Sequence, residues 1–560
     1  MGFMKSFLLL AAIVIFGFFI RTYHVAVNPP SLSWDEVSIG YNAYSILKTG
    51  RDEHGRFLPL DFFKAYGDYK PPLAIYSAVP FVFLFGLTDM AVRLPAAFFG
   101  TLSILMTFFI VQELFRVRSG KKNEGAFDGA FGTDLALISS ALLAVSPWHV
   151  NLSRGGFEAV VALFFVLLGV WSILSSRTNP KRFYIMWLPF VAAIYTFNSS
   201  RYFVPLLSLA LLWVIREKLK VHYKKFFIGV AIAGICMLPI LPHLVSQEAR
   251  LRFKEVNIFT DTSVVTQAND RTARTENRLV SFLVNNRRIG FIRSYLMHFT
   301  DNLQPEFLFI KGDGNPKFSI QDTGQFYLME APLMVIGFFG MFILYPSQAS
   351  LLLFWLLSAI VPAATARETP HALRILNSLP TWHIYIAFGL LTVLYRIKRW
   401  DKHKLFLYVS IAVISVTYML QVGYYLHEYY AHYPKEFSGE WQYGYREAIQ
   451  KILPIQQKYS TVVITDSIGR PYMYTAFYTK SPPGDFLTSK KSHTDAAGFY
   501  HVDGFFNYTF AEVLPVDLKP GTLYVWDAIE VPKGVRVIDT IRLLNGKPTL
   551  VIFDTGEGIL

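Results

Sequence analysis

The stretch SFLLLAAIVIFGFFI, residues 6–20, follows Lys5 and contains no charged side chain. It lies within a run, residues 4–22, that is long enough to cross a bilayer as a helix, which takes about 20 residues. A cleaved signal peptide would end in a small-residue cleavage site. None follows this run, and many similar runs do, so we expect an uncleaved first membrane span.

Similar apolar runs occur along the whole chain. Its 560 residues are 53% hydrophobic and 17% charged, against about 45–50% and about 25% in ordinary globular domains. Eleven runs suit membrane spans, at residues 4–22, 92–114, 133–148, 158–176, 183–199, 202–216, 226–245, 328–346, 349–366, 377–395 and 405–427. Residues 72–88 are short for a span and contain Pro80, which favours an interface helix. We therefore expect a polytopic α-helical membrane protein with about 11 transmembrane helices plus interface helices.

The basic residues predict the orientation in the membrane. The formal net charge is +13, but Lys and Arg gather in short clusters between apolar runs, as membrane topology requires and a nucleic-acid surface does not. With the N-terminus cytoplasmic, the inner loops contain Arg116, Arg118, Lys121 and Lys122, then Arg177, Lys181 and Arg182, then residues 216–225 and 396–404. Loops 23–91, 147–158, 246–327 and 366–380 then face outward. No nucleic-acid partner is expected.

The last part of the chain differs in composition from the rest. Residues 446–459, REAIQKILPIQQKY, form an amphipathic pattern, and TVVITD, TLYVWD and PTLVIFD are typical of short buried strands. The sequence therefore predicts a transmembrane domain at 1–428 and an extracytoplasmic α/β domain at 429–560. The single cysteine, Cys236, lies in an apolar run, which excludes an intrachain disulfide and a cysteine-based metal site.

Polar and ionisable residues gather on the predicted outward side, at the ends of different spans. Each residue alone is typical of a solvated loop. Because they all lie on the predicted outward side, together they indicate a binding or catalytic site. They are Asp35, Glu36, Asp68 and Lys70 in the first loop; His149, Arg154 and Glu158 in the second; Tyr195, Asn198 and Arg201 in YTFNSSRY; Lys311 and Asp313 in IKGDG; and Arg367, His371 and Arg374 before the span at 377–395.

These residue types indicate a particular chemistry. A carboxylate can act as a general base that deprotonates a hydroxyl, and Arg and Lys bind phosphate. Together they suit displacement at a carbon that bears a phosphate leaving group. A glycosyl phosphate on a lipid carrier is the substrate that reaches the membrane surface. Lys70 is followed by Pro71 and Pro72, which start a helix without needing a backbone donor.

The order of WDE (34–36), KPPL (70–73), RLPAAFFG (93–100) and SPWHVNLSR (146–154) with Glu158 resembles the integral-membrane (GT-C type) glycosyltransferases. It is similar in particular to the dolichyl-phosphate-mannose–protein mannosyltransferase superfamily and its bacterial relatives, including the lipid A aminoarabinose transferases. The resemblance covers residues 1–215, and 290–400 more loosely. Loop 246–327 is too short for the β-trefoil insert of the eukaryotic enzymes, which leaves the acceptor open as lipid, glycan or protein.

The resemblance implies roles for individual residues. Asp35 is the expected catalytic base, and Glu36 the residue that orients the acceptor or the loop. The donor phosphate is expected to contact Lys70, Arg154 and one of Arg374 and Arg367, with Arg374 favoured. The remaining residues are expected to contact the acceptor or the sugar: Glu158, His149, Tyr195, Asn198, Arg201, Asp68 and His371.

The expected reaction is an inverting transfer of a sugar from a polyprenyl-phosphate-linked donor, at the outer face of the plasma (inner) membrane. A phosphate leaves without general-acid assistance, so one carboxylate suffices. No cofactor is expected, because Lys70 and Arg374 can neutralise the phosphate instead of a metal. A divalent metal held by Asp35, Glu158 and His149 is left open. The alternatives are oligosaccharyltransferase-like transfer of a preassembled glycan, a transporter or flippase, and a membrane anchor whose working part is the C-terminal domain.

Overall fold

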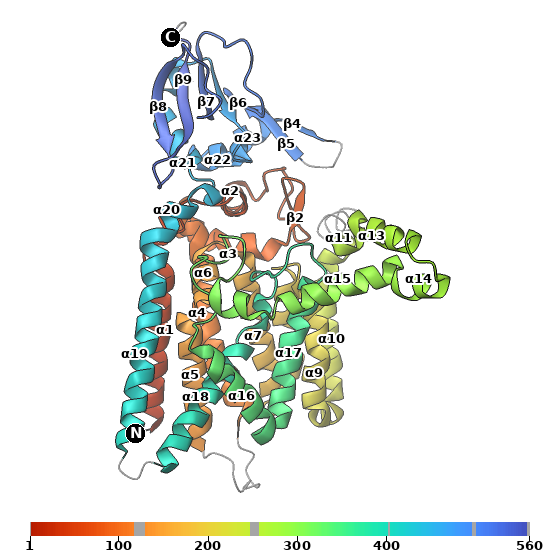
Figure 1. Ribbon diagram of the computed structural model, residues 1–560. Helices are drawn as coiled ribbons and strands as arrows, with labels where there is room; N and C mark the ends of the chain where they lie inside the picture. The colour runs from red at the N-terminus through yellow and green to blue at the C-terminus, as the bar shows by residue number, and fades with distance from the viewer. Residues whose placement is uncertain (1, 117–128, 247–256, 401–403, 496–499, 557–560) are drawn as a thin grey trace. The chain divides into compact units, whose positions relative to one another are not determined.

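The computed structural model describes residues 2–116, 129–246, 257–400, 404–495 and 500–556 (Figure 1). The chain divides into two compact units. Unit 1 contains Met1–Arg21, Phe98–Ser153 and Glu158–Tyr425, and unit 2 contains Thr22–Ala97, Arg154–Phe157 and Leu426–Leu560. This division differs from the predicted boundary at 428/429, because residues 22–97 pack with the C-terminal portion.

Unit 1 is helical, and its long helices run side by side as a bundle (Figure 1). The helices that lie wholly or mainly in it are α1 (Gly2–Thr22), α4 (Asp89–Leu114), α5 (Gly129–Val145), α6 (Pro147–Arg154), α7 (Glu158–Ser175), α8 (Leu188–Ile194), α9 (Ser200–Val221), α10 (Tyr223–Met237), α11 (Leu241–Leu244), α13 (Thr262–Ala273), α14 (Arg278–Val284), α15 (Arg287–Asp301), α16 (Glu330–Leu344), α17 (Pro346–Ala363), α18 (Thr381–Trp400) and α19 (Leu405–His427).

Close packing within unit 1 depends on small residues. A Cβ atom at Gly337 of α16 would collide with the backbone oxygen of Tyr385 in α18, and one at Gly389 would collide with that of Leu333. Glycine at both positions lets the two backbones approach closely, as in many membrane helix pairs.

Seven helices in the described part of the chain are long and apolar enough to cross a membrane, or eight if the bent pair Phe131–Val145 and Pro147–Arg154 is one span. They match eight of the eleven predicted spans, so the chain is a multi-pass membrane protein, but the predicted number was too high by this criterion. Run 183–199 is broken and contains α8 of only 7 residues. Helix α9, at run 202–216, ends in the charged stretch REKLK, and α16, at run 328–346, has 15 residues.

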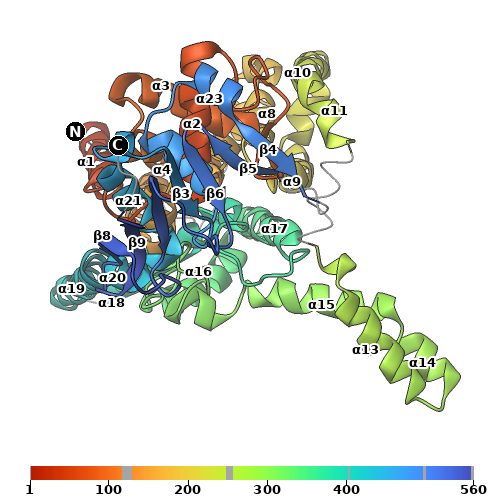
Figure 2. The same ribbon diagram turned by 90° about the horizontal axis from the view of Figure 1, so that it is seen from above.

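The loops that are predicted to face outward contain more helix than the sequence indicated. Residues 72–88 form helix α3 (Pro72–Phe85), as predicted. Much of loop 246–327 is also helical, since α13, α14 and α15 form an arm that projects from the bundle of unit 1 (Figures 1 and 2). Arg118, Lys121 and Lys122 lie outside the described residues, as do residues 247–256 of that loop and 401–403 of the predicted inner loop.

Unit 2 contains a hairpin, a larger sheet and six α-helices among its described residues. The hairpin strands β1 (Phe63–Ala65) and β2 (Asp68–Lys70) pair antiparallel. The sheet has the order β4-β5-β6-β3-β7-β9-β8. The elements are α2 (Trp34–Thr49), α3, α20 (Tyr433–Phe437), α21 (Tyr445–Ile452), α22 (Pro471–Tyr478), α23 (Pro483–Ser489), β3 (Thr461–Thr465), β4 (Lys491–Thr494), β5 (Tyr500–Phe505), β6 (Tyr508–Ala511), β7 (Thr522–Asp527), β8 (Arg536–Arg542) and β9 (Pro548–Asp554).

The sheet confirms the predicted α/β character of the C-terminal portion. Strands β3, β7 and β9 coincide with the three predicted apolar runs, and the predicted amphipathic helix is α21, which ends before Pro454. One sheet face and helices α21, α22 and α23 share a core with α2 of the first loop, through residues such as Val37 and Tyr41. Burial of this shared apolar surface holds the first loop and the C-terminal portion in one unit.

Glu53 connects the same parts of unit 2 through polar contacts. Its carboxyl group is buried and accepts hydrogen bonds from Asn42 Nδ2 (3.2 Å) and Tyr472 Oη (3.4 Å). Lys490 Nζ donates to the backbone oxygen of Glu53 (2.8 Å). Burial raises the pKa of Glu53 from 4.5 to about 7, despite the opposing effects of the Lys490 charge and of these hydrogen bonds.

Because the pKa of Glu53 is raised in the folded protein, its carboxyl group stays protonated between pH 4.5 and about pH 7. In the unfolded chain the same group is ionised in this pH range. Stability therefore falls as pH rises through this window. Gln at this position keeps polar atoms for hydrogen bonds and cannot ionise. We expect the Tm of the wild type to fall between about pH 5 and about pH 8, and the Tm of Glu53→Gln to fall by at most half of that amount. Thermal unfolding in detergent tests this, with the exposed Glu440→Gln as control. An unchanged pH dependence in Glu53→Gln would contradict it.

Candidate active site

Asp35 and Lys70 are brought together by local structure in unit 2. Asp35 lies in the first turn of α2, and Lys70 is the last residue of β2. Lys70 Nζ lies 3.0 Å from Asp35 Oδ1 and 3.6 Å from Asp68 Oδ2. The side chain of Asp35 is 39% exposed, and that of Lys70 is 13% exposed. The structure thus joins three of the predicted site residues in a cluster that is open to solvent.

The sequence positions Lys70 by means of a tight turn and a helix start. Residues 66 and 67 link β1 and β2 in a two-residue turn in which Tyr66 has φ 57° and Gly67 has φ 97°. Positive φ at both positions is typical of the type I′ turn that matches the twist of a hairpin. Pro71 and Pro72 then begin α3 directly after the lysine. The backbone on both sides of Lys70 is therefore restricted.

Glu36 has a different environment from its neighbour Asp35. It is buried, and its Oε1 accepts from Arg93 Nε (2.8 Å) and from the backbone nitrogen of Gly156 (2.9 Å). Its Oε2 accepts from the backbone nitrogen of Ser33 (2.8 Å). These contacts fix the start of α2. Glu36 therefore acts as a positioning residue for the turn that presents Asp35.

Arg93 completes this buried cluster. Its guanidinium is fully buried and donates to the backbone oxygens of Val25 (2.9 Å), Pro29 (2.7 Å) and Ser31 (2.5 Å). One side chain therefore holds the chain leading into α2 and neutralises Glu36. The sequence contained this residue in RLPAAFFG, but the expected site did not include it.

Arg154 makes a second set of buried contacts in unit 2. Its Nε donates to Tyr429 Oη (3.1 Å), and its Nη2 donates to the backbone oxygens of Tyr23 (2.7 Å) and Asn28 (2.8 Å). The guanidinium also lies over the rings of Tyr429 and Tyr430, 5.0 and 5.2 Å from their centroids. These contacts give Arg154 a structural role, and its phosphate contact stays a prediction.

Unit 1 contains a separate polar cluster around Asp313. Asp313 Oδ2 accepts from the backbone nitrogen of Ala372 (2.6 Å), and its Oδ1 accepts from that of Asn315 (2.8 Å). His371 Nδ1 lies 3.9 Å from the same carboxylate. Burial raises the pKa of Asp313 to about 6, against these hydrogen bonds and the charge of Arg374. Burial and then the Arg374 charge hold the pKa of His371 well below its ordinary value.

The other predicted residues of unit 1 are dispersed over several elements. Tyr195 donates to the backbone oxygen of Cys236 (2.8 Å). Exposed Arg367 donates to the backbone oxygen of Asn257 (3.3 Å) and to Thr260 Oγ1 (3.1 Å). Three more residues are half-buried at helix starts or between helices: Glu158, Asn198 and Arg201.

His149 is buried next to a positive charge. Its Nδ1 lies 2.6 Å from Arg21, whose guanidinium also donates to the backbone oxygens of Gly17 and Ala144. A guanidinium at this distance opposes a cation at His149. Among the described residues, the groups with ligand atoms close enough for a metal are His427, Glu428 and His432, and Asp466, His501 and Glu512. Neither group contains the predicted ligands.

Comparisons with known proteins agree with the sequence resemblance. Residues 11–120, which include Asp35, Lys70 and Arg93, match the family model of the dolichyl-phosphate-mannose-protein mannosyltransferases. The crystal structure of apo ArnT from Cupriavidus metallidurans aligns with a TM-score of 0.54 at 12% identity, over 99% of this chain and 98% of that one. The chain has the fold of the GT-C glycosyltransferases. The predicted resemblance and fold class are confirmed, and the match of residues 11–120 agrees with the predicted enzyme class.

Two further GT-C structures show weaker similarity. The apo oligosaccharyltransferase of Archaeoglobus fulgidus aligns at 11% identity and a TM-score of 0.49, over 84% of this chain and 63% of that one. The S. cerevisiae Pmt1–Pmt2 complex aligns at 19% identity and a TM-score of 0.32, over 46% and 36%. No curated protein matches the chain significantly in sequence. The ArnT alignment extends through the C-terminal portion, for which the sequence alone shows no resemblance.

The different environments of Asp35 and Glu36 predict that substituting them changes the stability of the protein by different amounts. Glu36→Gln leaves the buried guanidinium of Arg93 without its charge partner, which typically costs about 3–5 kcal/mol. Asp35→Asn breaks a partly exposed pair, which is worth about 0–1 kcal/mol. We expect a large fall in Tm for Glu36→Gln and a small one for Asp35→Asn. Thermal unfolding in detergent measures both, and equal losses would contradict the assigned roles.

Proposed function

We propose that this protein transfers a sugar from a polyprenyl-phosphate-linked donor to an acceptor hydroxyl in a single inverting displacement. The observation that carries the proposal is the 3.0 Å pair of Asp35 and Lys70. The pair lies within the residues that match a family whose name specifies a lipid-phosphate-linked sugar donor.

In the proposed reaction, Asp35 accepts the proton of the acceptor hydroxyl while its oxygen attacks the anomeric carbon. The bond from that carbon to the phosphate oxygen breaks, and its electron pair leaves with the polyprenyl phosphate. The anomeric configuration inverts because one displacement occurs. A phosphate leaves without being protonated, so one carboxylate suffices where glycosidases use two.

Lys70 is the proposed partner of the donor phosphate. An ammonium group acts as a point charge with three donors, so contact with a phosphate oxygen is compatible with contact to Asp35. The position of Lys70 next to the base would place the leaving group and the nucleophile at one site. Glu36 cannot take the role of the base, because its oxygens are bound in the buried cluster.

Other parts of the proposal rest on the sequence. Arg374 remains the favoured second phosphate ligand, with Arg367 as the alternative, and the acceptor is a lipid, glycan or protein. The basic loops support a cytoplasmic N-terminus, with the site and the C-terminal domain on the outer side of the plasma (inner) membrane. The bilayer supplies the lipid-linked donor.

The role of Asp35 can be tested with purified protein in proteoliposomes. General-base catalysis typically contributes 10²–10⁴-fold, so we expect Asp35→Asn to lower kcat by about that factor. Released polyprenyl phosphate is measured with a panel of polyprenyl-phosphate sugars. Exposed Asp517→Asn is the matched control and keeps the wild-type rate. A wild-type rate in Asp35→Asn would sink the proposal.

The proposed role of Lys70 predicts that the transfer rate depends on a positive charge at this position. Removing one preorganised donor to developing negative charge typically costs about 10²–10³-fold in kcat, and we expect this loss in Lys70→Met. Lys70→Arg keeps the charge and should recover part of the rate. The same release assay measures both variants. If Lys70→Met and Lys70→Arg are equally active, Lys70 does not stabilise the leaving phosphate.

The donor panel also separates the alternatives. A monosaccharide donor releases polyprenyl phosphate in the proposed reaction, and a requirement for a preassembled glycan indicates an oligosaccharyltransferase-like enzyme. Translocation of the intact lipid without release of polyprenyl phosphate would indicate a flippase and contradict the proposed transfer.

A further inference from the structure

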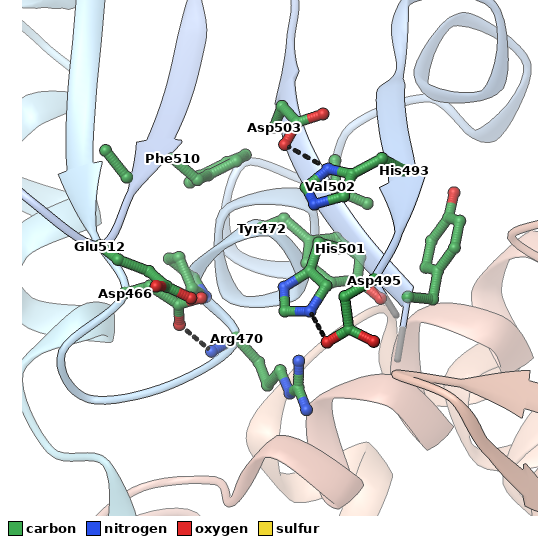
Figure 3. A pocket seen from close by; sticks show the side chains of 13 residues that line it. Asp466, Arg470, Tyr472, His493, Asp495, His501, Val502, Asp503, Phe510 and Glu512 are labelled. Carbon is green, nitrogen blue, oxygen red and sulfur yellow. Dashed lines mark hydrogen bonds and ion pairs between the residues drawn. The ribbon is translucent and has the colours of Figure 1, made fainter. Parts of the chain in front are cut away.

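A cavity lies at the C-terminal sheet, and the residues that line it are far in sequence from the WDE motif. The cavity has a volume of about 460 Å³ and lies where strands β3 and β6 end (Figure 3). These two strands run parallel. In α/β sheets, ligands bind preferentially outside the carboxyl ends of parallel strands.

The register of three strands places two acids and a histidine together. Thr465 of β3 is paired with Ala511 of β6, so the next residues, Asp466 and Glu512, leave the sheet side by side. Strand β5 pairs antiparallel with β6, with Gly504 opposite Thr509, and the same register brings His501 opposite Glu512. One ligand atom from each of Asp466, His501 and Glu512 lies within 4.8 Å of the others.

Outer contacts orient two of these side chains. His501 Nε2 lies 3.1 Å from Asp495 Oδ2, and the other ring nitrogen lies on the side of Asp466 and Glu512 (Figure 3). A carboxylate that binds the second nitrogen of a histidine is the usual companion of a metal-ligating imidazole. Asp466 Oδ1 accepts from the backbone nitrogen of Arg470 (2.7 Å), which fixes that carboxylate.

Arg470 is the cation whose charge acts on Asp466, but it makes no salt bridge with either acid. Across the described ranges of the chain, neither Asp466 nor Glu512 forms an ion pair. The guanidinium of Arg470 instead lies over the ring of Tyr66, 5.2 Å from its centroid. Two neighbouring carboxylates repel each other, and a bound divalent ion would offset this repulsion.

We propose that Asp466, His501 and Glu512 bind a divalent transition-metal ion, with Zn²⁺ the best match. Zinc takes imidazole nitrogen and carboxylate oxygen as ligands, whereas calcium and magnesium prefer oxygen alone. Three protein ligands leave a coordination position for water or for an oxygen of a ligand held in the cavity. The site is separate in sequence and in chemistry from the proposed transferase site.

The test uses the full-length protein in detergent. The protein is stripped with a chelator, incubated with Zn²⁺ and dialysed, and bound zinc is counted by mass spectrometry. We expect the wild type to hold one equivalent more than His501→Gln or Glu512→Gln. His493→Gln is the matched control, because this ring stacks on His501 at 5.2 Å but is not among the three ligands. It should bind the wild-type amount.

Two further measurements distinguish a ligand site from a folding defect. Asp495→Asn should weaken zinc binding by about 10–100-fold, the usual effect of losing an outer carboxylate. Zinc should raise the Tm of the wild type and of His493→Gln, and should raise the Tm of His501→Gln by a smaller amount. Without metal, all three proteins should unfold at similar temperatures. Equal zinc in wild type and His501→Gln overturns the proposal, and so does a site that takes Ca²⁺ and not Zn²⁺. Asp35→Asn should bind zinc normally, so failure of the transferase proposal leaves this one testable.

Discussion

The buried ion pair between Arg93 and Glu36 is the constraint on which the organisation of the proposed catalytic residues depends. A buried guanidinium needs a full set of acceptors, because an unpaired charge in a low-dielectric interior is very costly. Arg93 finds them in Glu36 and in three backbone oxygens between residues 25 and 31. Satisfying one buried cation therefore fixes the path of the chain into α2.

This constraint explains why two adjacent acids have different environments. Successive residues on a helix point about 100° apart. When Glu36 is drawn into the core by Arg93, Asp35 must face outward, toward Lys70. The hairpin turn at Tyr66 and Gly67 and the two prolines after Lys70 restrict the other side of the pair. A rigid buried support thus presents an accessible carboxylate and a cation, which suits a displacement that needs both.

Features that depend on nearby residues were predicted from the sequence more successfully than features that depend on contacts between distant segments. Apolar runs predicted the membrane helices and strands β3, β7 and β9, because burial on both faces leaves a continuous apolar pattern. The same criterion predicted eleven spans, whereas seven or eight described helices are long and apolar enough to cross a membrane. The sequence of run 183–199 does not show where packing breaks it into α8 and its neighbours. Strands β4, β5 and β8 carry charged and polar residues and were not predicted. The motifs suggested Asp35 and Lys70 as candidates, and the structure places them 3.0 Å apart, whereas Arg93 was overlooked as part of an apolar stretch.

The sequence by itself determined the fold class and predicted a chemistry, because hydrophobicity and short motifs are local properties. It placed WDE and KPP in one loop and predicted a lipid-linked phosphate substrate from the residue types. The tertiary structure decided which acid is accessible, that the first loop belongs to the same unit as the C-terminal sheet, and that Asp466, His501 and Glu512 meet. These outcomes depend on strand register and on burial between distant segments, and no local pattern encodes either.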